Sequence, residues 1–365
     1  MDQEFTQFNA RRGIILRFFK EKKRATISQL VKVAKEYPGI KVSKITINRD
    51  LSELIRLGWI KRIGKARATF YELAPEYETI REINVNNYFK IDTDKRQIIE
   101  KFNFNIFDLL KKVDIFAPDG TDFLKEINND YIKNIKSIPR DIIKREFERL
   151  IIDLSWKSSK IEGNTYSLLE TENLIKKKKE AKGKTKEEAT MIINHKIAFD
   201  YILKNKNNFK KISISKIEDV HYLLTKGLKI SRNLRRTAIG ITGTNYMPLD
   251  NQYQIREAME STCKLVNSQK DSFAKGLILM IMIAYIQPFT DGNKRTSRML
   301  GNAILLANSI CPLSYRSADE IEYKKAVILF YELNNIRYFR TLFITQFMFA
   351  VKNYFRVKIK STINK

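Results

Sequence analysis

An unbroken run of ten apolar residues occupies positions 277–286. Its length predicts a buried core helix, because a membrane-spanning helix needs about 20 apolar residues. Pro288 disfavours continued helix, and the Asp-Gly-Asn sequence at 291–293 is typical of a turn. Apolar spacing resumes at Met299, so we expect a second helix to begin near Arg295. The pattern therefore predicts two core helices joined by a short polar loop.

This loop carries side chains that suit an anion. Lys294, Arg295 and Arg298 lie at the expected start of the second helix, where backbone N–H groups also point toward a ligand. Asp291 adds a hard oxygen ligand of the kind that Mg²⁺ prefers. The residues favour a site for a nucleotide and its magnesium, and a plain polar turn is the alternative.

Two further amphipathic helices are expected at 189–203 and 214–228, and they contain the only histidines, His195 and His221. Neither histidine has a His, Cys or acidic partner at metal-ligand spacing. We therefore expect both to be packing or surface residues. Before these two helices, the lysine run at 176–186 predicts a solvated loop.

Residues 1–73 predict a compact basic unit of three helices followed by a hairpin. They hold 17 Lys and Arg against 7 Asp and Glu, a difference of +10. The third helix is expected to begin at Ser43 and to stop at Gly58, and the hairpin strands at 59–63 and 68–73. This order resembles a winged helix-turn-helix domain with its recognition helix near residues 47–60.

That resemblance implies DNA binding. Four residues of the third helix would face the major groove: Lys44, Thr46, Asn48 and Arg49. Basic residues of the hairpin would meet phosphates: Lys61, Arg62, Lys65 and Arg67. The alternative is a solvated face on a domain used for dimerisation, because winged helices also serve as protein-interaction modules.

The remaining stretches are less specific. Residues 74–139 predict a helical connector with turn clusters at 92–96 and 118–122, and residues 351–365 a basic tail. Nothing in the connector indicates chemistry.

The stretch from 287 to 298 closely resembles the signature of the Fic family, His-x-Phe-x-(Asp/Glu)-Gly-Asn-Gly-Arg-x-x-Arg. Six positions match in register: Phe289, Asp291, Gly292, Asn293, Arg295 and Arg298. The resemblance covers residues 140–350 and implies a mainly α fold, a Fic-type helical core with a β-hairpin flap, here preceded by the small α+β winged domain. It also implies ATP and Mg²⁺ as cofactors, with the matched residues and Lys294 binding the nucleotide.

Residues 140–164 resemble the inhibitory helix that precedes the core in part of this family. An amphipathic helix is expected to run from Pro139 and to end in the stretch 158–164. Within this stretch Ser158, Glu162 and Gly163 match the motif Ser/Thr-x-x-x-Glu-Gly/Asn. The resemblance implies that Glu162 pairs with Arg298 and so competes with a nucleotide γ-phosphate for one guanidinium. An ordinary capping glutamate is the alternative.

Residues 235–249 alternate in the manner of a β-strand around a Gly243 turn and resemble the Fic flap, a hairpin beside the active site. The resemblance implies that the flap holds an extended segment of the target protein by β-augmentation. The flap residues concerned would be Ile239, Gly240, Ile241 and Thr242. An exposed hairpin without this role is the alternative.

Fic enzymes of this type transfer AMP from ATP to a protein Ser, Thr or Tyr hydroxyl. Gln287 stands where the family has its catalytic His, and an amide cannot accept the proton of that hydroxyl. General-base catalysis contributes about 10² to 10⁴ in rate. The chain with Gln287 is therefore expected to be inactive or strongly impaired. Either the natural protein is a pseudoenzyme, or Gln287 is an introduced substitution that traps an inactive state.

Lys294 occupies a position where Gly is common and resembles Doc-type members, which transfer the γ-phosphoryl group instead. Because Arg298 is retained, the sequence favours adenylyl transfer, autoinhibited by Glu162. A Doc-like phosphotransferase and a catalytically dead nucleotide-sensing DNA-binding regulator are the alternatives.

Length and composition limit the number of domains and the kinds of partner. With 365 residues the chain has room for two or three domains, and its net charge of +27 favours anionic partners. Cys263 and Cys311 lack the spacing of a disulfide framework or a zinc site. The N-terminal residues lack a signal-peptide pattern. We expect a cytoplasmic protein with no membrane contact, whose partners are a target protein, DNA and, as an open option, a second copy in a homodimer.

Overall fold

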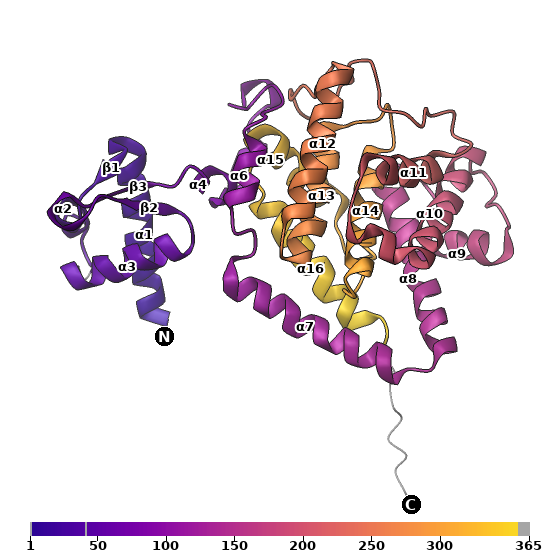
Figure 1. The fold of residues 1–365 in the computed structure, drawn as a ribbon, viewed down its shortest axis with the longest axis horizontal. Coiled ribbons are helices and arrows are strands. Elements are labelled where there is room, and N and C mark those ends of the chain that lie inside the picture. The colour runs from indigo at the N-terminus through magenta and orange to yellow at the C-terminus, as the bar shows by residue number, and fades with distance from the viewer. Residues whose placement is uncertain (1, 41, 357–365) are drawn as a thin grey trace, which may run out of the picture. The chain divides into compact units, whose positions relative to one another are not determined.

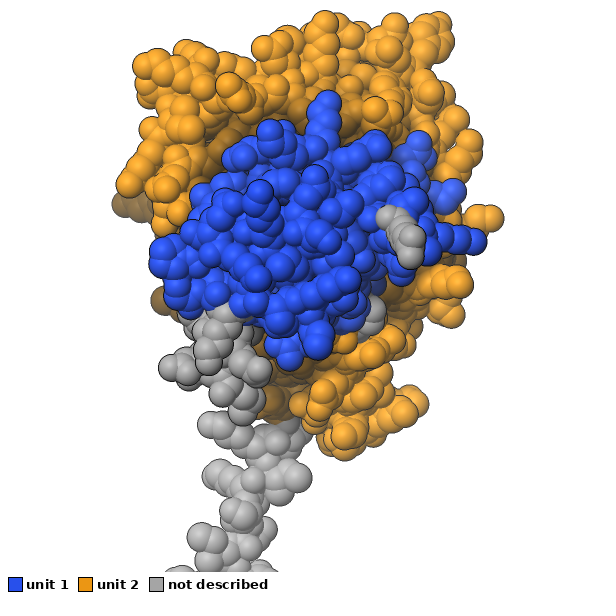
Figure 2. Space-filling model, turned by 90° about the vertical axis from the view of Figure 1, so that its left-hand side faces the viewer, with its two compact units in different colours: residues 1–83, 108–117 blue, residues 84–107, 118–365 orange. Residues whose placement is uncertain are grey.

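The computed structural model describes residues 2–40 and 42–356 (Figure 1), although the side chains at 2–9, 67 and 118 lie outside the description. The chain forms two compact units, coloured separately in Figure 2. The smaller is Met1–Ile83 with Asp108–Ala117, and the larger is Asn84–Phe107 with Pro118–Lys365. The stretch 74–139, which we expected to be one connector, is divided between them.

The smaller unit contains the three predicted helices and the hairpin. Its helices are α1 (Asp2–Lys22), α2 (Ile27–Lys35), α3 (Lys44–Arg56) and the short α4 (Tyr77–Ile80). Its antiparallel sheet has the order β1-β3-β2, with β1 at Arg24–Ala25, β2 at Ile60–Ile63 and β3 at Phe70–Leu73. A 3₁₀ turn, η1 (Ala66–Ala68), joins β2 to β3. This arrangement is consistent with the expected winged helix-turn-helix class.

Local chemistry explains these boundaries. The side chain of Thr26 caps α2 in a capping box with Gln29, and Ser43 caps α3 by accepting from the N–H of Thr46 at 3.0 Å. A buried ion pair then joins α1 to α3, because Arg11 donates two hydrogen bonds to Asp50, one of them from Nη2 to Oδ1 at 3.0 Å. The strand β1 was missed in the sequence because two residues carry no periodic pattern.

The larger unit is almost entirely helical. Its long helices are α7 (Ala117–Ser137), α8 (Arg140–Ile161), α9 (Leu168–Lys177), α10 (Lys186–Lys204), α11 (Ile214–Thr225), α12 (Gln252–Ser268), α13 (Ser272–Ile286), α14 (Asn293–Ala307), α15 (Glu320–Leu333) and α16 (Arg337–Asn353). Shorter helices are α5 (Val85–Lys90), η2 (Thr93–Lys95) and η3 (Lys206–Lys210), whereas α6 (Ile106–Lys112) is divided between the two units. The mainly α fold class is therefore confirmed.

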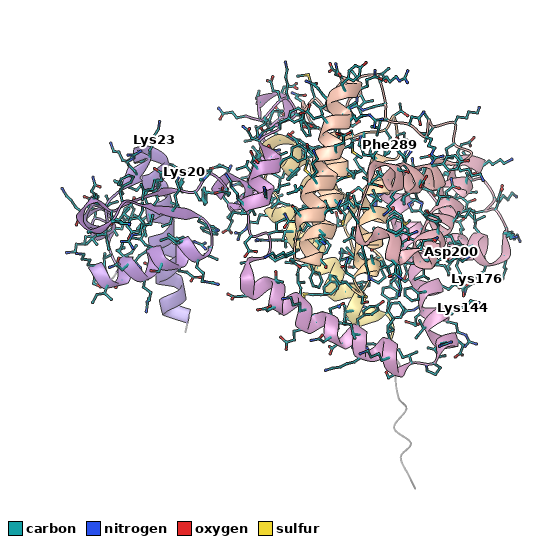
Figure 3. All side chains as sticks on the ribbon, in the orientation of Figure 1. Lys20, Lys23, Lys144, Lys176, Asp200 and Phe289 are labelled. Atoms are coloured by element: carbon teal, nitrogen blue, oxygen red, sulfur yellow. The ribbon has the colours of Figure 1, made fainter. Side chains whose placement is uncertain are left out.

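The centre of the larger unit is α13, as its apolar run predicts. Every residue from 276 to 286 is buried, and α13 contacts α12, α14, α15 and α16 (Figure 1). By contrast, the lysines labelled in Figure 3 are exposed: Lys20, Lys23, Lys144 and Lys176. Within the described residues, no helix combines the length and the apolar character needed to cross a membrane.

Two predictions of local structure are wrong. Residues 118–122 form the first turns of α7 rather than a loop, because the first turn of a helix tolerates a proline that lacks an N–H donor. The hairpin expected at 235–249 is an extended loop, and every described strand belongs to the smaller unit. The backbone partners of this loop come from elsewhere: Arg235 N donates to Pro288 O at 2.9 Å, and Met247 N to Glu100 O at 2.7 Å.

Close packing of α13 on α14 depends on Gly301, where a Cβ would overlap Sδ and Cγ of Met280. Met280 has little freedom to move away, because its Sδ and O accept from Tyr315 and Ser297 respectively. We expect Gly301→Ala to lower the free energy of unfolding by about 1–3 kcal/mol through overpacking. Urea denaturation measures this loss.

Gly276 provides the matched control on the facing helix. A Cβ there would lie 3.4 Å from Cδ2 of Leu305, an ordinary contact. Gly276→Ala should leave stability unchanged or raise it by up to about 1 kcal/mol through helix propensity. Equal losses for the two variants would contradict the packing argument.

Candidate active site

The loop between α13 and α14 is held in one conformation by its own residues. The Asn293 side chain accepts from the N–H of Phe289 at 2.8 Å and donates to its carbonyl at 2.7 Å. Gly292 has a φ of 79°, and a Cβ there would lie 3.0 Å from Cγ2 of Thr225. Position 292 therefore requires glycine, and position 293 an amide that donates and accepts at once.

His221 on α11 supports the same loop. Its ring stacks on Phe289 with centroids 3.6 Å apart and planes 4° apart, and its Nε2 donates to the carbonyl of Asp291 at 3.0 Å. Burial lowers the pKa of His221 to about 4, so the imidazole is neutral at pH 7 with its proton on Nε2. This histidine is a packing residue, one of the two roles expected for it.

Arg298 projects from α14 into the interior and is completely buried. Its Nε donates to Oγ of Ser158 at 2.9 Å, and its Nη2 donates to the Ser158 carbonyl at 2.9 Å and to Oε1 of Glu162 at 2.8 Å. Its guanidinium also lies 5.1 Å from the ring centre of Tyr323. The structure thus brings Arg298 to Ser158 and Glu162, from which it is remote in sequence, and Gly163 follows Glu162 at a φ of 95°.

Electrostatic interactions keep both Arg298 and Glu162 in their charged forms. Burial by itself would lower the pKa of Arg298, but the phenol of Tyr323 and the carboxylate of Glu162 raise it overall. Burial would likewise raise the pKa of Glu162, but Arg298, Lys294 and Arg295 outweigh burial and lower it. The pair is therefore ionised at neutral pH.

His195 on α10 completes the network around Arg298. Its Nδ1 lies 2.8 Å from the carbonyl of Met191, which only accepts, so Nδ1 carries the proton. Its Nε2 accepts from the Ser158 hydroxyl at 2.8 Å, which leaves the lone pairs of that oxygen for Arg298. Burial lowers the pKa of His195 to about 3, which keeps the imidazole neutral.

Arg295 leaves one donor available. Its Nη2 pairs with Oδ2 of Asp291 at 3.0 Å, while its Nη1 is buried without a hydrogen-bond partner in the described structure. Burial lowers the pKa of Arg295, and the charge of Arg298 acts in the same direction. The Asp291 side chain is 67% exposed, and its Oδ1 accepts from the N–H of Gly292 at 2.5 Å. An anion beside this loop would satisfy the orphaned nitrogen.

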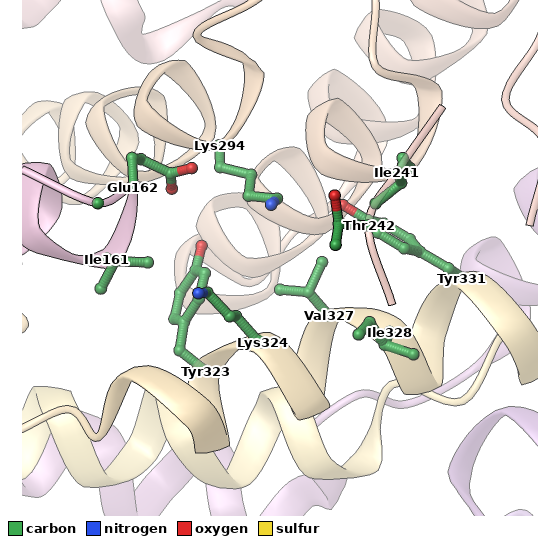
Figure 4. A pocket seen from close by; sticks show the side chains of 11 residues that line it. Ile161, Glu162, Ile241, Thr242, Lys294, Tyr323, Lys324, Val327, Ile328 and Tyr331 are labelled. Atoms are coloured by element: carbon green, nitrogen blue, oxygen red, sulfur yellow. The ribbon is translucent and has the colours of Figure 1, made fainter. Parts of the chain in front are cut away.

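A cavity of about 340 Å³ opens beside this cluster (Figure 4). Glu162 and Lys294 lie on one side of it, and Figure 4 shows the Lys294 ammonium extending into the space between Glu162 and Thr242. Apolar and aromatic side chains of α15 form another wall: Tyr323, Val327, Ile328 and Tyr331. Its volume and mixed lining are typical of small-molecule sites.

Of the four expected flap residues, Ile241 and Thr242 line the cavity. Ile239 and Gly240 precede them in the same extended loop, Ile239 half-buried and Gly240 exposed. The flap therefore lies beside the cavity as expected, although it is an extended loop and not a hairpin.

Gln287, at the expected position of a catalytic base, is turned into the protein. It ends α13 with a φ of 50°, and its Nε2 donates to the Ala284 carbonyl at 2.6 Å and to the Tyr331 hydroxyl at 3.1 Å. The side chain is therefore oriented by hydrogen bonds that an amide donates.

Arg235 connects this helix end to both ends of the flap. Its buried guanidinium donates to the carbonyls of Gln287 and Thr237, each at 2.6 Å, and also to that of Leu249. A cation is favoured there because carbonyls at a helix C-terminus carry partial negative charge. Burial lowers the pKa of Arg235.

The proposed DNA-facing residues lie in the smaller unit. Lys44, Asn48 and Arg49 are exposed on α3, and Lys65 is exposed beside η1, whereas the side chain of Arg67 lies outside the described residues. The hydroxyl of Thr46 lies 2.8 Å from that of Ser43 and so belongs to the helix cap. Lys44, Thr46, Asn48 and Arg49 thus all lie within the first six residues of α3.

Sequence reasoning missed several residues of the site. Tyr323, Val327, Ile328 and Tyr331 follow ordinary helical spacing and give no signal beyond that of a core helix. Arg235 and His195 are buried, but each has polar neighbours in the sequence, such as Arg236 and Lys196, so no local pattern distinguishes them.

Residues 211–305, which include the loop, match the sequence model of the Fic/DOC family. The chain is 27% identical over 190 residues to a protein adenylyltransferase Fic from Culex quinquefasciatus, covering 50% of this chain and 37% of that protein. It is 27% identical over 189 residues to one from Nematostella vectensis, covering 50% and 43%. The chain thus spans less than half the length of these relatives.

Solved structures share the fold. A Fic-1 fragment from C. elegans has a TM-score of 0.56 at 20% identity, covering 63% of this chain and 70% of that one. A Fic family protein from Desulfovibrio desulfuricans has a TM-score of 0.53 at 19% identity, covering 69% and 74%. Together these findings support a Fic/DOC family domain within the larger unit.

The pairing of Glu162 with Arg298 gives a pH-dependent prediction. The lowered pKa of Glu162 means that its carboxylate stabilises the fold above its unfolded pKa of about 4.3, and that this contribution is lost as the pH falls through the folded pKa. We expect Glu162→Gln to lower the free energy of unfolding by about 1.5–3 kcal/mol at pH 7. The difference should shrink below pH 4 in urea titrations.

Glu172→Gln is the control, because Glu172 forms an exposed ion pair with Lys176 at 2.7 Å. That substitution should cost about 0–1 kcal/mol at pH 7. A Glu162→Gln loss that is no larger, or that persists at pH 3, would contradict a buried ionised pair.

Proposed function

We propose, from the Fic/DOC domain that the larger unit carries, that this chain is a protein adenylyltransferase by descent, which transfers AMP from ATP to a Ser, Thr or Tyr hydroxyl of a target protein. The observation that carries this proposal is the pair of buried guanidinium groups, Arg295 and Arg298, close to a cavity that Glu162 and Lys294 line. The curated relatives are adenylyltransferases by name, which agrees with this chemistry.

In this proposal the triphosphate lies over the loop at Gly292. The free Nη1 of Arg295 and the ammonium of Lys294 would bind its oxygens, and the apolar side chains of α15 with Ile241 would contain the base. Asp291 suits Mg²⁺, which typically takes one or two carboxylates and substrate phosphates. When bound, the ion would neutralise phosphate charge.

We propose that Glu162 is inhibitory. Its carboxylate occupies the Nη2 of Arg298 at 2.8 Å, so this nitrogen cannot bind a phosphate oxygen at the same time. Displacing Glu162 requires a competing anion, since Arg298 is too deeply buried to remain without one.

Gln287 limits catalysis in this proposal. Its amide nitrogen already donates to Ala284 and Tyr331, and an amide takes no proton from an attacking hydroxyl. The nucleotide would therefore be bound while transfer is slow. Lys294 favours the second candidate, γ-phosphoryl transfer, because its ammonium extends into the cavity where it could hold a terminal phosphate (Figure 4).

The test introduces the missing base and removes the competitor. We expect Gln287→His with Glu162→Ala to raise transfer by about 10² to 10⁴ over Glu162→Ala alone, the contribution of a general base. Label from ATP carrying ³²P at the α-phosphate should then appear on protein, including the chain itself. Label only from the γ-phosphate would indicate phosphoryl transfer, and no label from either would overturn the enzymatic proposal.

We propose that the smaller unit binds DNA, because Lys44 and Asn48 are exposed on the capped helix α3 and Lys65 is exposed in the turn between β2 and β3. Lys65→Ala should weaken binding equally for all sequences and reduce the salt slope by about 0.9. Lys44→Ala should in addition reduce discrimination between sequences.

Fluorescence anisotropy with DNA from upstream of the coding sequence, measured across salt concentrations, tests this. Lys144→Ala is the control, since Lys144 is exposed on α8 of the larger unit. Binding that does not depend on salt, or an equal effect of all three substitutions, would favour the dimerisation alternative.

A further inference from the structure

Residues 84–103, which we call the strap, contain α5 and η2 and lie in the larger unit. The strap meets the end of α15 through a buried ion pair between Arg96 and Glu332, with 3.3 Å between Nη1 and Oε1. The Arg96 side chain is 7% exposed and that of Glu332 is 0% exposed. The Tyr88 hydroxyl donates to the other oxygen of Glu332 at 2.6 Å. Two strap residues therefore satisfy one carboxylate on α15.

The strap also holds the flap. Nη1 of Arg96 donates to the carbonyl of Gly243 at 3.3 Å, so one nitrogen is shared between the flap and α15. Nearby, Nδ2 of Asn245 donates to Oδ1 of Asp94 at 2.9 Å, and the N–H of Met247 donates to the carbonyl of Glu100 at 2.7 Å. Residues 243–247 of the flap thus have hydrogen-bond partners in the strap instead of in a second β-strand.

These contacts join two walls of one cavity. The flap supplies Ile241 and Thr242, and α15 supplies Val327, Ile328 and Tyr331, whereas no strap residue lines the cavity. The two walls are already close, since a Cβ at Gly243 would lie 3.6 Å from Cδ1 of Ile328. The strap thus contacts both walls through charged and polar side chains that do not line the cavity itself.

We propose that Arg96 is a positioning residue that fixes the flap against α15 and so sets the shape of the cavity. The planar guanidinium bonds to the Gly243 carbonyl, the Glu332 carboxylate and the Ile91 carbonyl together, and a lysine ammonium on a flexible stem does not reproduce this fork. The effect on nucleotide binding rests on the proposed function, whereas the effect on the flap does not.

The experiment measures hydrogen exchange at the Met247 amide and the affinity for ATP with Mg²⁺, the latter in a Glu162→Ala background. Arg96→Gln should increase the exchange rate at Met247 at least tenfold and weaken ATP binding at least fivefold. Arg96→Lys keeps the charge that compensates Glu332, so it should retain the melting temperature of the parent and still show faster exchange and weaker binding.

Lys95→Gln is the matched control, because Lys95 is adjacent, 77% exposed and paired only with Asp92 in the described structure. It should change both quantities less than twofold. Parent-like exchange at Met247 in folded Arg96→Lys would overturn the proposal, as would faster exchange with unchanged ATP affinity. Absence of ATP binding in the parent would overturn the proposed function, and the exchange data would still decide the role of Arg96 in holding the flap.

Discussion

The buried guanidinium of Arg298 is the constraint on which the centre of the larger unit depends. A permanent charge in a protein interior is tolerated only if hydrogen bonds and a counter-charge surround it. Here the end of α8 supplies both, through Ser158 and Glu162, and His195 on α10 fixes the Ser158 hydroxyl. One side chain thereby holds three helices, α8, α10 and α14, in a single arrangement.

The same constraint couples stability to the proposed activity. Glu162 stabilises the fold because it neutralises Arg298, and in the proposed function it would oppose ligand binding because it occupies the nitrogen that a phosphate would use. The protein would therefore be most stable in the form in which the proposed site is closed. Arg295, which keeps a buried donor without a partner, shows that the loop is not fully satisfied by protein groups alone in the described structure.

Flap and loop are held by different means. The loop closes on itself through Asn293 and a glycine conformation, so nearby residues decide its shape. The flap depends on partners more than 40 positions away, namely the carbonyl of Pro288 and the strap around Arg96. Its alternating pattern is typical of a strand, but in the described structure Met247 forms an isolated parallel bridge with Lys101 and the flap does not pair with itself as a hairpin. The turn predicted at 118–122 is wrong for a similar reason, because a turn-like composition is equally compatible with the first turn of a helix, here α7.

What the sequence determined by itself was local: the apolar run of α13, the capping residues of α2 and α3, and the spacing that places Asp291, Gly292 and Asn293 at the start of α14. These features depend on backbone preferences and periodicity within a few residues, which a linear chain records directly. The pairing of Glu162 with Arg298 was anticipated only through a resemblance to a known family. Tertiary structure alone decided that His195 orients Ser158, that Arg235 joins Gln287 to the flap, and that Arg96 meets Glu332, because hydrogen bonds between buried polar groups depend on the packing of helices distant in sequence.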